Sequence, residues 1–138
     1  MTRINLVDPA ELMDQHLIAE YREIRLLCAN LTRTLNSKRG FRQEAVPDEF
    51  TLNSGHVYFF YDKGRYIHKR YEQLKAEMRE RGFVPQHEFP LEIWPTELYN
   101  DWEPSERDKD IVRERIAQRI SERPGWYRYG GELYENKS

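Results

Sequence analysis

The fold is decided by residues 8–37, which read DPAELMDQHLIAEYREIRLLCANLTRTLNS. Apolar side chains recur there at spacings of three and four residues, which is the pattern of an amphipathic helix. Asp8 is a suitable N-cap, Pro9 suits the first helical position, and Glu11 completes a capping box. The side chains expected to face the core are Leu17, Ile24, Leu27, Cys28, Leu31 and Leu35. We therefore predict one long helix over residues 8–37.

Two further helices are predicted from the same kind of pattern. Residues 64–81 form the second, and Gly82 is a good left-handed stop after it. Its apolar face carries Ile67, Tyr71, Leu74 and Met78. Residues 106–122 form the third, with Ser105 as the cap and Asp108 at the third position. Its inward side chains are Val112, Ile116 and Ile120.

The connecting segments are long and aromatic. The run Val57–Tyr61 has the composition of a strand, but it is also short enough to be a buried connector or a helix start. Residues 84–104 contain four prolines and read as a loop that the core holds in place. The side chains expected to hold it are Phe89, Leu91, Ile93, Trp94, Leu98 and Trp102. We expect a compact all-α single domain over residues 1–138, with three main helices and its N-terminus near the C-terminal tail.

Composition limits the class of protein. The chain has 138 residues and a single cysteine, Cys28, which excludes an internal disulfide and a multi-cysteine zinc site. No apolar run approaches the roughly 20 residues of a membrane span, and the first residues have no signal-peptide core. These features predict a cytoplasmic protein, near the nucleoid in a bacterium or in the host cytoplasm for a phage, and no membrane partner.

Charge is segregated along the chain, although the total is only −2. Residues 63–85 carry seven basic and three acidic side chains, whereas residues 86–110 carry two basic and eight acidic ones. If the basic segments share one face, the molecule has a surface suited to a polyanion. The plain alternative is that the segregation only reflects solvated helices and acidic loops.

Most standard catalytic motifs are absent from the sequence, including the phosphate loop and the nucleophile elbow of hydrolases. The four histidines, at positions 16, 56, 68 and 87, have no metal-ligand spacing. Every chain also carries an α-amine, which here is that of Thr2 after removal of Met1, although a threonine at position 2 taken alone is an ordinary residue. The amine's ordinary pKa of about 8 leaves part of it neutral, so it can attack a sugar carbon and form an imine. Arg3 would lower that pKa and hold a phosphate.

Glu23 is the matching acid–base residue. It lies between Arg22 and Ile24, at the margin of the apolar face of the first predicted helix. A carboxylate at such a margin can be partly desolvated and able to move protons. The alternative is an ordinary solvated glutamate on a helix.

Several blocks of sequence together resemble the pyrimidine dimer DNA glycosylases of the phage endonuclease V (DenV) type. They are distributed in the right order from one end of the chain to near the other, and they are Met1–Leu6, Asp14–Leu17, Ala19–Glu23, Gly55–Lys63, Lys69–Arg70, Arg81–Phe83, Ile116–Ile120 and Arg123–Tyr129. The resemblance implies a three-helix all-α repair enzyme that needs no metal and no cofactor. It also implies a monomer whose partner is double-stranded damaged DNA.

The resemblance assigns roles to individual residues. The Thr2 amine would attack C1′ of the damaged nucleotide, and Glu23 would stabilise the cationic imine and assist β-elimination, which nicks the strand. The residues that would bind DNA near the lesion are Arg3, Gln15, His16 and Arg22 from the N-terminal part, Arg115 and Arg119 from the third helix, and Trp126, Tyr127 and Arg128 from the tail.

The chain departs from the family pattern in several places. Residues 30–52 and the acidic loop 86–110 match poorly, and the total charge is −2 although the familiar phage member is basic. Positions 25 and 26 also differ. The family usually carries Pro-Arg where this chain has Arg25 and Leu26, so a DNA-binding arginine has moved one residue, about 100° around the helix. We keep Arg25 as a DNA-binding residue. Two alternatives stay open: an enzyme of the same fold that acts on other damaged bases or abasic sites, and a non-catalytic DNA-binding protein. Thr2 together with Glu23 favours an enzyme, because binding alone requires neither.

Overall fold

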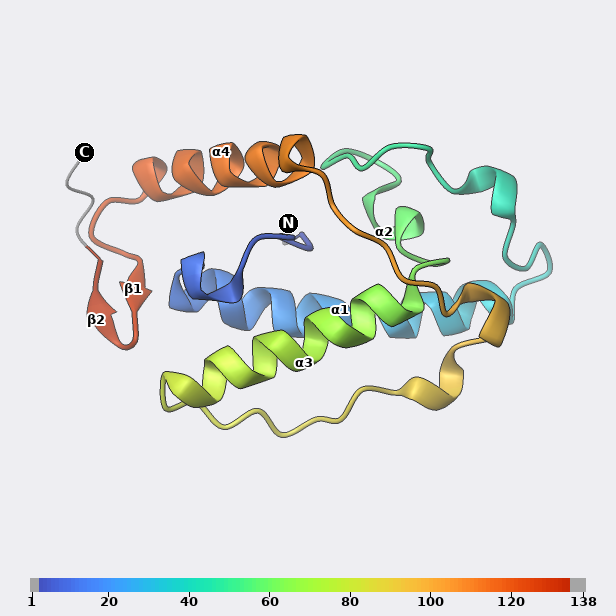
Figure 1. Ribbon diagram of the computed structural model, residues 1–138, viewed down its shortest axis with the longest axis horizontal. Coiled ribbons are helices and arrows are strands. Elements are labelled where there is room, and N and C mark those ends of the chain that lie inside the picture. The colour runs from blue at the N-terminus through green and yellow to red at the C-terminus, as the bar shows by residue number, and fades with distance from the viewer. Residues whose placement is uncertain (1–2, 135–138) are drawn as a thin grey trace.

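Two long helices form the centre of the molecule. The computed structural model describes residues 3–134, in which α1 (Asp14–Leu35) packs along α3 (Gly64–Glu80) (Figure 1). Their facing side chains are buried, and Tyr21 of α1 stacks on Tyr71 of α3 with ring centroids 5.0 Å apart. The all-α prediction is confirmed, because the only strands in the described residues are two of two residues each.

The third long helix, α4 (Glu106–Glu122), has the bounds that its local signals predict. Ser105 Oγ accepts from the Asp108 N–H at 3.1 Å, and the Asp108 carboxylate accepts from the Ser105 N–H at 3.1 Å. Val112 and Ile116 are its buried side chains. Near its N-terminal half, Arg113 makes a two-point ion pair with Glu11 at 3.0 and 3.2 Å.

The prediction of one helix over residues 8–37 is wrong at its start. Residues Pro9–Glu11 form a separate 3-10 turn, η1, which Asp8 caps by accepting from the Ala10 N–H at 3.0 Å. Leu12 and Met13 are then extended and buried, so α1 begins only at Asp14. Burying these two apolar side chains outweighs the local capping signal, and no capping box forms with Glu11.

Helix α1 also carries a buried charge that its sequence pattern did not indicate. Glu20, which is not among the side chains expected to face the core, is fully buried. Arg70 of α3 binds it with two donors, Nε to Oε2 at 2.7 Å and Nη2 to Oε1 at 3.0 Å. The third donor of Arg70 reaches the carbonyl of Val7. One ion pair therefore joins both central helices to the N-terminal segment.

The remaining elements are short. The sequence of residues 57–61 was compatible with a strand, a buried connector or a helix start. The structure has a one-turn helix there, α2 (His56–Phe59). The 3-10 turns η2 (Gln43–Ala45), η3 (Leu91–Ile93) and η4 (Thr96–Leu98) interrupt the connectors. Within the proline-rich loop, Phe89, Trp94 and Leu98 are buried as predicted, whereas Leu91 is exposed, which corrects that prediction.

The C-terminal tail forms a small hairpin that was not predicted from the sequence. Strands β1 (Arg128–Tyr129) and β2 (Glu132–Leu133) pair antiparallel across a Gly130-Gly131 turn. Both glycines have positive φ, +61° and +86°, as a two-residue primed turn requires. The hairpin lies beside the N-terminal end of α1 (Figure 1). Within the described residues, the N-terminal part of the chain therefore lies near the C-terminal tail, as predicted.

Candidate nucleic-acid interface

A pocket of about 300 Å³ opens between the N-terminal half of α1, the C-terminal half of α4 and the tail. It brings together seven of the residues predicted to bind DNA: Arg3, Gln15, His16, Arg115, Arg119, Trp126 and Tyr127. Asn5, Ala19 and Arg123 complete its lining. The pocket thus unites segments more than 100 residues apart, as the resemblance requires.

The lining is strongly basic. Four arginines, at positions 3, 115, 119 and 123, surround the pocket, and none of the described residues that line it is acidic. Burial lowers the pKa of Arg115 from its ordinary value, and the charges of Arg119 and Arg3 lower it further. Like charges crowded in this way favour an anion, and the phosphates of a nucleic acid supply one.

His16 is one of the lining residues, and its lowered pKa makes it neutral at pH 7. Burial lowers its pKa to about 4, with further lowering by Arg115 and Arg119. Its ring stacks on Tyr127, with centroids 4.8 Å apart. The neighbouring ring of Trp126 packs edge-on against Tyr127 and carries the Arg123 guanidinium over its face. The result is an aromatic wall beside a basic one, which suits bases and phosphates respectively.

Two buried polar atoms of the lining residues have no hydrogen-bond partner within residues 3–134. They are Asn5 Oδ1 and His16 Nδ1. An unpaired buried polar atom costs about 1–3 kcal/mol, so both favour a hydrogen-bonding ligand or water. Asn5 was not singled out from the sequence, since an asparagine in a short N-terminal segment carries no local signal.

Glu23 lies on α1 two turns beyond His16 and is half-buried. Burial raises the pKa of its carboxyl, while the nearby Arg3 guanidinium opposes the rise. The expected partial desolvation is therefore confirmed. A carboxyl poised in this way can hold a proton more readily than a solvated one and release it to a partner, as general acid–base chemistry requires.

The segment before this pocket is held firmly by two hydrogen bonds. Arg3 Nε donates to the Leu52 carbonyl at 2.9 Å, and the Ile4 N–H donates to His56 Nε2 at 3.0 Å. His56 is buried, and its Nδ1 lies 2.7 Å from the Thr51 carbonyl. These bonds therefore fix the positions of Arg3, which lines the pocket, and of Ile4, which follows it.

Comparison with known families agrees with this geometry. The sequence model of the pyrimidine dimer DNA glycosylases matches residues 1–91, about two thirds of the chain. The chain belongs to the pyrimidine dimer DNA glycosylase family. It is thus a DNA-repair glycosylase, and DNA is its substrate.

The matched region of the glycosylase contains Arg3, Gln15, His16 and Glu23, whereas α4 and the tail lie beyond it. In the structure, the same pocket is also lined by Arg115, Arg119, Trp126 and Tyr127. Thr2, the predicted nucleophile, lies outside the described residues. It directly precedes Arg3, which lines the pocket.

Three of the predicted DNA-binding residues of the glycosylase do not line the pocket. Arg22 is exposed on α1, and Arg128 is exposed on the hairpin. Arg25 lines a separate groove of about 350 Å³ together with Cys28 and His87. Two helical positions separate Arg25 from Glu23, a turn of about 200°, which places it on the other side of α1. Contacts of Arg22, Arg25 and Arg128 with DNA remain predictions.

Other features of the glycosylase bear on metal and thiol chemistry. Residues 3–134 hold no cluster of three or more His, Cys, Asp or Glu side chains suited to a metal ion. Cys28 is buried, and burial raises its pKa to about 12, so its thiolate is scarce. None of the helices in that range is long and apolar enough to cross a membrane.

Proposed function

We propose that this protein is a bifunctional glycosylase and abasic-site lyase that acts on pyrimidine dimers in double-stranded DNA. The α-amine of Thr2, freed by removal of Met1, is the nucleophile. The observation that carries the proposal is the basic and aromatic pocket reached by Arg3, the residue next to that amine, with the half-buried Glu23 close to Arg3.

The chemistry proceeds in two stages. The amine lone pair attacks C1′ of the damaged nucleotide, the glycosidic bond breaks, and its electron pair leaves with the base. Opening of the sugar gives a cationic imine between Thr2 and C1′. Loss of a proton from C2′ then expels the 3′ phosphate, which nicks the strand, and water later hydrolyses the imine.

Each feature of the pocket supports one requirement of this sequence. The Glu23 carboxylate stabilises the cationic imine, and its carboxyl moves the protons of ring opening and elimination. The arginines bind the phosphates that flank the lesion, and the His16–Tyr127–Trp126 wall packs against exposed bases. Unstacking is cheapest at damaged sites, which contributes selectivity for the lesion. We further propose that the enzyme acts as a monomer in the cytoplasm, where the DNA is.

Borohydride trapping tests the nucleophile directly. The protein is incubated with a duplex that contains an abasic site, and the imine is reduced to a stable adduct. We expect an adduct with the mature protein and none with protein acetylated at its N-terminus or extended by one residue. No adduct with the free-amine protein would refute the enzymatic mechanism and favour the non-catalytic DNA-binding alternative.

A different lesion preference is the second candidate function. Leu26 is 58% exposed where the resemblance expects an arginine, and Arg25 faces another groove. The DNA-facing surface of α1 therefore has altered chemistry. Nicking of ultraviolet-irradiated and of oxidised duplexes should be compared. Cleavage of irradiated DNA supports the dimer assignment, whereas cleavage of oxidised or abasic DNA alone supports the alternative.

A further inference from the structure

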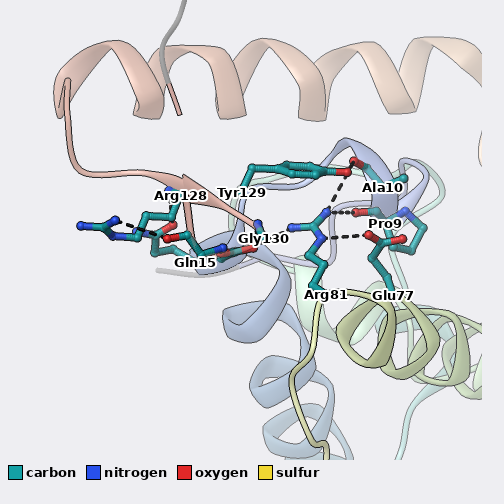
Figure 2. Close-up of polar contacts among 10 residues, drawn as sticks. Pro9, Ala10, Gln15, Glu77, Arg81, Arg128, Tyr129 and Gly130 are labelled. Atoms are coloured by element: carbon teal, nitrogen blue, oxygen red, sulfur yellow. Dashed lines mark hydrogen bonds and ion pairs between the residues drawn. The ribbon is translucent and has the colours of Figure 1, made fainter. Parts of the chain in front are cut away.

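A buried ion pair lies next to the turn of the C-terminal hairpin. Its members are Asp14, the first residue of α1, and Arg81, which directly follows α3. Arg81 Nη1 lies 3.0 Å from Asp14 Oδ1, and both side chains are less than 10% exposed. Figure 2 shows the polar contacts that gather around Arg81 and the hairpin.

Asp14 binds the turn of the hairpin through the backbone. Its Oδ1 accepts from the Gly130 N–H at 2.8 Å, and its Oδ2 accepts from the Gly131 N–H at 2.7 Å. Successive amides that converge on one anion form a small anion-binding concavity. Gly130, which lies between the two amides, has a positive φ of +61°, and the carboxylate of Asp14 fills the concavity.

Arg81 forms the second layer of the same contact. Its Nε donates to Glu77 at 2.8 Å, and its Nη2 donates to the Pro9 carbonyl at 3.2 Å. The Tyr129 ring covers the guanidinium, with 3.9 Å from Cζ to the ring centroid. The Tyr129 hydroxyl then donates to the Ala10 carbonyl at 2.6 Å (Figure 2). One cation thus joins α3, η1 and β1.

Gln15 links this contact to the pocket. Its Nε2 donates to the Trp126 carbonyl at 2.7 Å, and its Oε1 accepts from the Arg128 N–H at 3.0 Å. The two bonds bracket Tyr127, the residue that stacks on His16. Two neighbouring residues of α1 therefore hold the tail. Asp14 binds the Gly130-Gly131 turn of the hairpin, and Gln15 binds the backbone on both sides of Tyr127 in the aromatic wall.

From these contacts we infer that Asp14 and Arg81 are positioning residues, which hold the hairpin so that Trp126 and Tyr127 present a preformed wall to damaged DNA. Neither residue lines the pocket or takes part in the chemistry. Their effect is therefore on the recognition of the lesion and not on the reaction of bound DNA, because a preformed wall need not be ordered when DNA binds. The inference rests on the proposed function for the identity of the ligand.

Asp14→Asn is the main test, because it keeps the size of the side chain and removes its charge. The amide leaves one hairpin N–H facing another donor and Arg81 without its anion. The matched control is Glu11→Gln, which removes the same charge from the Glu11–Arg113 pair, an ion pair that does not touch the hairpin. Arg81→Lys keeps the cation but loses the planar fork, so its effect should be intermediate.

Binding is measured first, with all variants acetylated at the N-terminus so that no imine can form. The Kd for a duplex with one pyrimidine dimer should rise about tenfold or more in Asp14→Asn, which corresponds to loss of one charged hydrogen bond. It should stay within about twofold of the parent in Glu11→Gln. Amide hydrogen exchange at Gly130 and Gly131 should accelerate in the variants of Asp14 and Arg81 and stay unchanged in Glu11→Gln. This arm needs no catalysis, so it tests the inference even if the trapping experiment fails.

The rate is measured second, with free-amine protein and single turnover at saturating enzyme. The maximal rate should change by less than about threefold, while the enzyme concentration for half-maximal rate rises in line with the Kd. Unchanged Kd and amide exchange in Asp14→Asn would overturn the inference. A fall in maximal rate and Tm together, with no selective loss of affinity, would overturn it as well, since that pattern indicates general destabilisation. If Asp14→Asn does not fold, Tyr129→Phe, which removes only the bond to Ala10, must still accelerate exchange in the hairpin.

Discussion

His56 should make the protein less stable in mild acid. Its ring is 2% exposed and packs edge-on against Phe50 and Phe60, each with centroids 5.4 Å away. Nε2 accepts from the Ile4 N–H, so the proton of the neutral ring is on Nδ1, facing the Thr51 carbonyl. Protonation would place a second hydrogen against the Ile4 N–H and release the segment that leads to the pocket.

The size of the effect follows from the pKa. Burial is the largest cause that lowers the pKa of His56, from an ordinary 6.5 to about 4, and Arg3 and Arg115 add to it. In the folded protein the neutral form is favoured, so the unfolded chain binds more protons between these two values. Stability is therefore complete above pH 6.5 and falls as the pH drops toward 4. The full difference is about 3 kcal/mol, of which about 2 kcal/mol is lost by pH 5.

Urea unfolding at pH 8 and pH 5 measures this loss. His56→Gln cannot titrate, so its own difference between the two pH values should be smaller than that of the parent by about 2 kcal/mol. His16, whose pKa is also lowered, is present in both proteins and cancels from the comparison. The control His87→Gln changes an exposed histidine and should keep the parent's dependence. Equal pH dependence in the parent and His56→Gln would refute the reasoning.

Three further predictions follow from the site and the core. Glu23→Gln should retain binding of dimer-containing DNA but lower single-turnover nicking about 100-fold, because it removes the proton-transfer group; unchanged nicking would exclude Glu23 from the mechanism. Leu26→Arg should add one phosphate contact on the exposed side of α1, so the slope of log K against log salt should steepen by about 0.9 in a salt titration of DNA binding. An identical slope would show that DNA does not reach this position. Glu20→Ala should lower the free energy of unfolding by about 3–5 kcal/mol, because it leaves Arg70 buried without its anion; a urea midpoint equal to that of the parent would contradict this.

The sequence by itself determined the features that depend on neighbouring residues. The bounds of α4 follow from Ser105 and Asp108, which satisfy each other's backbone within one turn. The end of α3 follows from Gly82, whose φ of +90° suits glycine. The apolar spacing of α1 likewise specified most of its buried face. Such signals act over three or four residues, so they can be read without knowledge of the fold.

Which residues share the site could be predicted only from the resemblance to the family. Nothing local indicates that Arg115 and Arg119 lie near His16, or that Tyr127 stacks on it. Asn5 and Arg123, which also line the pocket, were not among the predicted site residues. The resemblance named most of the lining, but the neutral state of His16 and the desolvation of Glu23 depend on what packs around them.

Only the tertiary structure decided the features that link distant segments. Helix α1 begins only at Asp14, because burial of the apolar side chains of Leu12 and Met13 in an extended conformation is more favourable than one more helical turn. Glu20 is buried because Arg70, 50 positions away, supplies its counter-charge. Asp14 holds a hairpin turn 116 residues later, through the backbone amides of Gly130 and Gly131. Partners so far apart leave no periodicity or motif, and hydrogen-bond and charge complementarity reveal them only once the chain has folded.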